Sequence, residues 1–224
     1  MSNYKCWVQD FPKRSLRLLE VFEKQAQARG LEVTLLLSVA SATICIPNDR
    51  LQDKGSSDAH IDTKRVNENA VSAIDSLLKT KIQDIQGLEI ANAPFGKLVK
   101  PRPGGKPDCG WDDYRADYND GKCCGSGKQF GTLIKHLRNA LAHGNVYTLA
   151  GQGNQIDEIV FLKSNYDHKN KKPSGDYDYL TLTPKQLSAF LRHWVTGLQG
   201  LGFQPEEISY AISQLDEEEL DEVA

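Results

Sequence analysis

The sequence predicts an all-α fold: a helical bundle that carries one small β-hairpin and one long irregular insertion. Apolar residues recur every three or four positions over most of the chain, which is the spacing of one face of a helix. Apolar and polar residues alternate, as in strands, in residues 156–163 and 177–183. Residues 92–128 follow neither pattern and are rich in proline, glycine, aspartate and cysteine. Such a segment in a compact domain is predicted to be irregular.

The first helix is expected to begin after Pro12 and to end at Arg29 and Gly30. A basic residue followed by glycine is a common helix C-terminus, because glycine adopts the left-handed conformation that ends the helix. A stripe of apolar residues is expected to turn this helix toward the core. The stripe consists of Leu16, Leu19, Val21, Phe22 and Ala26.

The second expected helix, residues 31–46, is apolar on nearly every side. Its β-branched residues would also suit a strand, but its length favours a buried helix, which Pro47 is expected to end. Residues 48–63 are polar and predict a loop. Residues 64–88 repeat apolar positions at helical spacing and predict a third, amphipathic helix.

After the insertion the pattern becomes regular again, and residues 130–143 predict a further helix. The two alternating segments are expected to pair as a hairpin around the polar loop 165–176. Thr183 followed by Pro184 predicts the N-cap and first residue of another amphipathic helix. We expect residues 1–204 to form a single domain with its insertion at about 48–128, and residues 205–224 to form a short helix and a solvated acidic tail.

Composition and charge limit the classes of function. The net charge is −3, so contact with nucleic acid would have to use a local patch rather than the whole surface. The N-terminus lacks the apolar run of a signal peptide, and the most apolar stretch is too short to span a bilayer. Five cysteines in a chain without an export signal predict reduced thiols. We therefore expect a cytoplasmic protein with no membrane contact.

The helix of residues 130–143 carries the side chains with the clearest chemical potential. At 100° per residue its apolar residues fall on one side. His136, Asn139 and His143 are expected on the opposite side, with Arg138 on the flank between them. An imidazole transfers protons near neutral pH, and a guanidinium binds phosphate oxygens in pairs. This surface can bind and cleave a phosphodiester, although His136 itself is expected to be an ordinary surface residue.

These residues resemble a known signature. The string LIKHLRNALAHGNVYTL (133–149) is similar to the signature helix of HEPN domains, in which an arginine, a polar residue, three further positions and a histidine follow one another. In this chain those positions are Arg138, Asn139, Ala140, Leu141, Ala142 and His143. The resemblance covers roughly residues 12–46 and 130–201 and is to bacterial HEPN proteins of plasmids and phage-defence loci. It implies a bundle of four or more helices.

The resemblance also implies a mechanism. Two protomers would appose their signature helices across a cleft and cut RNA by in-line attack of the 2′-hydroxyl, without a metal or other cofactor. Arg138 would stabilise the phosphorane, His143 would act as acid and base, and Asn139 would position His143. Some members carry a tyrosine, modified by a partner transferase, where this chain has Asn145. The implied partners are RNA, a second copy, and an antitoxin or regulatory protein, as in toxins and abortive-infection effectors.

The alternative is a HEPN domain that binds RNA or protein without turnover. The presence of Arg138, Asn139 and His143 together favours the enzyme, because a scaffold does not need them.

Three other parts of the sequence resemble binding sites only in part. Cys109, Cys123 and Cys124 suggest zinc, but they include no CxxC pair, and no nearby histidine offers a fourth ligand. The stretch GKCCGSGK lacks the spacing of a phosphate-binding loop. The basic segment 168–173, together with Lys97, Lys100 and Arg102, would either guide RNA phosphates or form a solvated loop.

Overall fold

The computed structural model describes residues 7–51, 68–85, 90, 93–98, 123–124, 128–151, 155–167 and 172–200. These residues are mostly helical, as the sequence predicts, and they also form an antiparallel sheet of five strands. The all-α class is therefore too narrow. None of the described helices combines the length and the apolar character needed to cross a membrane.

Helix α1 spans Trp7–Ala28 and so starts before Pro12, which lies inside it. The predicted start is wrong. The predicted apolar stripe is only partly buried: Leu19 is 1% exposed, whereas Val21 is 59% exposed and Phe22 is 44% exposed. The reason is that α1 packs on α2, α3 and α7 along one narrow side, which includes Val8 and leaves the adjoining apolar side open.

The second helix continues through the expected stop. Helix α2 (Glu32–Ala40), the π-helix η1 (Ser41–Cys45) and helix α3 (Ile46–Leu51) follow one another directly, and Pro47 lies within α3. A proline has no N–H to donate to the carbonyl four residues earlier, here that of Thr43. The indole Nε1 of Trp194 donates to this carbonyl instead, at 2.8 Å. A tertiary hydrogen bond thus satisfies the group that Pro47 leaves unpaired, and the prediction that Pro47 ends the helix is wrong.

The third helix is shorter than expected. Helix α4 spans Glu68–Lys79 and is followed by the 3₁₀ helix η3 (Ile82–Asp84). Helix α4 packs against the start of α6 (Phe130–Ala142), where an added Cβ at Gly131 would lie 3.0 Å from the carbonyl oxygen of Leu78. The small residue at position 131 allows this close approach.

The sheet has the strand order β2-β1-β5-β4-β3, and every pairing is antiparallel. The predicted hairpin is confirmed as β4 (Ile156–Asp167) and β5 (Lys172–Leu182), which extend into the expected loop. Strand β3 (Val146–Ala150) pairs with β4. Two strands, β1 (Pro94–Leu98) and β2 (Cys123–Cys124), lie within the insertion. The prediction of a wholly irregular insertion is therefore wrong.

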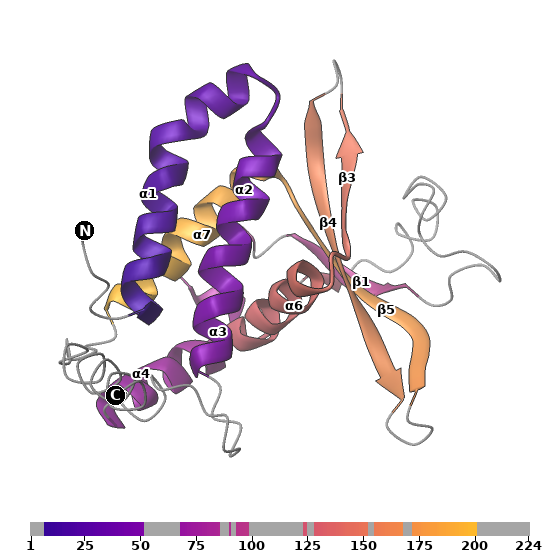
Figure 1. The fold of residues 1–224 in the computed structure, drawn as a ribbon. Coiled ribbons are helices and arrows are strands. Elements are labelled where there is room, and N and C mark those ends of the chain that lie inside the picture. The colour runs from indigo at the N-terminus through magenta and orange to yellow at the C-terminus, as the bar shows by residue number, and fades with distance from the viewer. Residues whose placement is uncertain are drawn as a thin grey trace, which may run out of the picture.

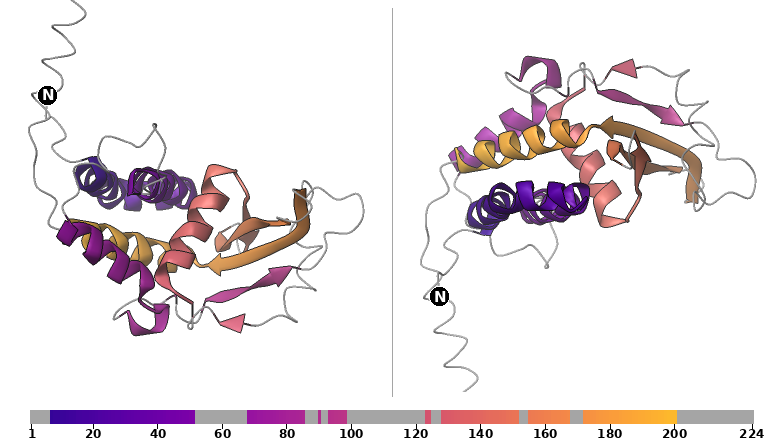
Figure 2. Two further views of the ribbon diagram at one scale, coloured as in Figure 1. Left: turned by 90° about the horizontal axis from the view of Figure 1, so that it is seen from below. Right: turned by 90° about the horizontal axis from the view of Figure 1, so that it is seen from above.

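Figures 1 and 2 show how the layers are arranged. Helices α1, α2 and α3 form one layer, while α4 and α7 (Pro184–Gln199) form another. Helix α6 crosses between these helices and the sheet (Figure 2). The predicted N-cap of α7 is confirmed, because the Thr183 hydroxyl accepts from the backbone N–H of Gln186 at 3.2 Å. The aromatic centre of the core consists of Phe130, Phe190 and Trp194. The expected helix after Pro205 lies outside the described residues.

Candidate functional site

The C-terminus of α6 has a defined geometry that fixes His143. The helix ends at Ala142, His143 is the C-cap, and Gly144 follows with φ +67°, in the left-handed region. Asn145 N–H donates to the carbonyl of Ala140 at 2.8 Å, and Gly144 N–H donates to that of Leu141 at 3.3 Å. This pair of bonds is a Schellman motif, which glycine allows without strain. The predicted helix end at Gly144 is thus confirmed.

The structure brings the three predicted site residues together at this end. Arg138 and Asn139 are half-buried, and His143 is exposed. The Arg138 guanidinium donates to Asn139 Oδ1 at 3.0 Å, so these neighbouring side chains form a pair rather than two independent groups. Asn139 and His143 are one turn apart on the helix. The described surface therefore presents an imidazole and an amide, with a guanidinium beside them.

His136 is the clear correction to the sequence prediction. The helical spacing predicts it on the outer side with Asn139 and His143, but it is 1% exposed. Its Nε2 lies 2.8 Å from the carbonyl oxygen of Phe161, and its ring centroid lies 5.2 Å from that of Phe95. Phe161 belongs to β4 and Phe95 to β1, so the sheet covers the side of α6 that a helical wheel assigns to solvent. His136 is therefore a core residue.

Burial lowers the pKa of His136 from 6.5 to about 4. Desolvation is the largest cause, and the bond to Phe161 and the charge of Asp178 oppose it, while Lys163 adds slightly to the lowering. A carbonyl oxygen only accepts hydrogen bonds, so Nε2 carries the proton of the neutral ring. At neutral pH this histidine is thus an uncharged hydrogen-bond donor and is not available as a titrating acid or base.

Strand β4 holds α6 on both sides of the Arg138–His143 segment. Before the segment, His136 bonds to the carbonyl of Phe161; after it, the N–H of Leu162 donates to the carbonyl of Asn145 at 2.9 Å. The two contacts come from adjacent residues of one strand. They restrain both ends of the segment, and a fixed segment holds its side chains in one geometry.

The other side of α6 packs against η1 and α3. The thiol of Cys45 lies 3.9 Å from the carbonyl oxygen of Arg138, so the π-helix contacts the backbone of the site directly. One turn further, the side-chain Nδ2 of Asn48 is buried without a hydrogen-bond partner in the described part of the chain. A π-helix inside an α-helix is frequent at functional sites. Nothing in the sequence pattern signals these two residues.

The face of α6 that carries Asn139 also carries an exposed cation outside the Arg138–His143 motif. Lys135 is exposed and precedes Asn139 by four residues, so the two share a face of α6. The same spacing that placed Asn139 near His143 would have found it. This face therefore carries a second positive charge beside that of Arg138.

The described residues contain no group of three or more histidine, cysteine or acidic side chains placed to hold a metal ion. Cys109 lies outside the described residues, and for Cys123 and Cys124 only the backbone of β2 is described. Most of the basic segment 168–173 also lies outside them.

Comparison with known proteins shows the family of the chain. A family model described as HEPN pEK499 p136 matches residues 1–198. No curated protein and no solved structure matches the chain. The family match covers the helical layers, the sheet and the Arg138–His143 segment, and therefore most of the chain. The protein belongs to the HEPN pEK499 p136 family.

Proposed function

We propose that this protein is a HEPN endoribonuclease that cleaves RNA without a metal, at a cleft formed by two copies of the chain. Family membership points to a nuclease-like or RNA-related module. The proposal of RNA cleavage rests on the end of α6, where the exposed His143 follows the hydrogen-bonded pair of Arg138 and Asn139.

The chemistry assigned to these residues is general acid–base catalysis with electrostatic stabilisation. A histidine removes the proton of the RNA 2′-hydroxyl, whose oxygen then attacks the adjacent phosphorus. The bond from phosphorus to the 5′-oxygen breaks, and that oxygen takes a proton from an imidazolium. The guanidinium of Arg138 meets the negative charge that develops on the phosphorane. The products are a 2′,3′-cyclic phosphate and a 5′-hydroxyl.

A second copy supplies what one protomer lacks. One α6 presents a single exposed histidine, His143, whereas the reaction needs one group to accept a proton and another to donate one. If the exposed faces of two α6 helices met across a two-fold axis, the second copy would place its own His143 and Arg138 on the opposite wall of a cleft. Asn139 would orient the imidazole, and Lys135 would bind RNA phosphates outside the reacting centre.

A cleavage assay on labelled RNA tests the reaction. We expect activity in excess EDTA, cyclic-phosphate ends, and no cleavage of the matching DNA, which lacks the 2′-hydroxyl. Arg138→Ala and His143→Ala should abolish cleavage, while the control variants Arg29→Ala and His60→Ala should retain it. Lys135→Gln should raise KM and leave kcat unchanged. Activity that EDTA removes and Mg²⁺ restores, or products with 3′-hydroxyl ends, would overturn the mechanism.

Two further measurements separate the enzyme from a binding module. Light scattering should give twice the chain mass of 24.9 kDa, and a monomer at micromolar concentration would contradict the shared cleft. A toxin or phage-defence effector should arrest bacterial growth when expressed, and the arrest should disappear with His143→Ala. RNA binding without cleavage, unchanged by that variant, would identify a HEPN domain that only binds.

A further inference from the structure

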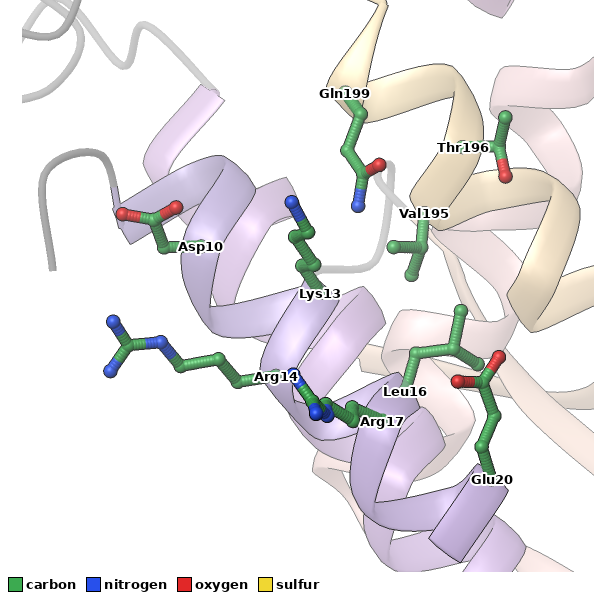
Figure 3. A pocket seen from close by; sticks show the side chains of 9 residues that line it. All are labelled: Asp10, Lys13, Arg14, Leu16, Arg17, Glu20, Val195, Thr196 and Gln199. Carbon is green, nitrogen blue, oxygen red and sulfur yellow. The ribbon is translucent and has the colours of Figure 1, made fainter. Parts of the chain in front are cut away.

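A groove between α1 and α7 lies apart from α6 and is lined by both charged and apolar residues. Its volume is about 570 Å³, and no residue of α6 lines it. Half-buried Leu16 contributes apolar surface, Val195 lines the groove but is only 1% exposed, and Lys13 and Arg17 contribute positive charge. Figure 3 shows Lys13 and Leu16 extending from α1 toward α7. A groove that combines apolar surface with cations fits an amphipathic acidic segment.

The charges of the groove are unevenly satisfied. Glu20 forms an ion pair with Arg192, with 2.8 Å between the carboxylate oxygen and the guanidinium nitrogen, so the negative charge of Glu20 is already paired. In the described part of the chain, by contrast, no ion pair joins Lys13 or Arg17 to an acidic group. These two cations lie on one side of α1, four residues apart. The groove therefore has positive charge available for a ligand.

The chain itself carries a segment of matching chemistry just beyond the groove. Gln199 lines the groove and its backbone carbonyl accepts a hydrogen bond from Gln9 of α1 at 3.4 Å, so the chain leaves α7 at the groove. Residues 205–224 contain eight acidic residues and no basic one, and two of the eight, Glu206 and Glu207, lie within residues 206–215. They also place apolar residues at the spacing of one helical face. These are Ile208, Ala211, Ile212 and Leu215.

We propose that residues 206–215 dock in the groove between α1 and α7 of their own chain. Ten residues of helix are about 15 Å long, which equals the length of α1 between Asp10 and Glu20. The few residues between Gly200 and Glu206 give the segment a high effective concentration at the groove. The apolar residues pack on Leu16, and Glu206 and Glu207 pair with Lys13 and Arg17. An RNA phosphate backbone would match the cations but leave the apolar surface uncovered.

Hydrogen exchange of the full chain, followed by mass spectrometry, tests the proposal. Peptides within residues 205–219 should exchange about tenfold more slowly in the wild type than in Lys13→Glu/Arg17→Glu, as expected for the loss of two ion pairs. The control Lys24→Glu/Arg29→Glu changes the net charge equally at the other end of α1, outside the groove, and should keep the protection. Adding Glu206→Lys/Glu207→Lys to the groove variant should restore it.

Three results would overturn the proposal. Equal exchange of residues 205–219 in the wild type and the groove variant would show that the segment does not dock there. Equal loss of protection in the control variant would assign the effect to overall charge. Protection that appears only at high protein concentration would show that the segment of a second copy is the occupant.

Discussion

Acidification should destabilise this protein, and His136 should contribute to the loss. In the unfolded chain its pKa is about 6.5, and in the folded protein it is about 4. Above pH 6.5 the ring is neutral in both states and the stability is fully present. As the pH falls from 6.5 toward 4, the unfolded chain binds a proton that the folded protein does not, so the free energy of unfolding decreases. At pH 4.5 the decrease from this residue is about 2.5 kcal/mol.

The measurement is urea unfolding at several pH values for the wild type and for His136→Gln. The glutamine amide can still donate to the carbonyl of Phe161 but does not titrate. The charged neighbours of the ring are Asp178 and Lys163, which form an ion pair with 3.4 Å between Oδ2 and Nζ. Both residues remain in both proteins. The difference between the two pH profiles therefore isolates His136. Parallel profiles between pH 6.5 and 4.5 would refute the assignment of a buried, neutral imidazole.

The remaining predictions concern the packing and the end of α6. Leu137→Ala should lower the unfolding free energy by about 2–5 kcal/mol, because Leu137 is fully buried. His143 is exposed, so His143→Ala should change the unfolding free energy by less than about 0.5 kcal/mol. Equal effects of the two variants in a denaturant titration would contradict the assignment of Leu137 to the buried face and His143 to the exposed face. Gly144→Ala should lower the unfolding free energy by about 1–2 kcal/mol, because φ at this position is +67°. No atom lies within 4 Å of the added Cβ, so the loss would come from the backbone conformation alone, and an unchanged melting curve would argue against the Schellman end. Trp194→Phe should cost about 1–3 kcal/mol by leaving the Thr43 carbonyl unpaired, and calorimetry that finds no loss would dismiss that hydrogen bond.

Local sequence determined the features that depend on neighbouring residues. The start of α6 at Phe130 and its end before Gly144 follow from apolar spacing and from the conformational freedom of glycine. The N-cap at Thr183 follows from its hydroxyl and from the proline after it. The central hairpin follows from alternation. Each of these depends on a few residues in a row, which is why a pattern in the sequence predicts it.

The candidate site was predictable to the extent that it lies within one helix. The spacing of Arg138, Asn139 and His143 places them at the same end of α6 whatever surrounds it. The spacing does not reveal Lys135 as a relevant cation unless its face is considered. It also says nothing of Cys45, which reaches the backbone of Arg138 from a segment 93 positions away.

Only the tertiary structure decided which helix faces are covered. A helical wheel compares residues of one helix, so it assigned His136 to solvent, and strands β1 and β4 then buried it. The same limit explains Val21 and Phe22, which are apolar but exposed because no described element packs on that side of α1. Pro47 stays inside a helix because Trp194, distant in sequence, satisfies the carbonyl of Thr43. Periodicity fixes which residues share a face, whereas burial depends on what the rest of the chain places against that face.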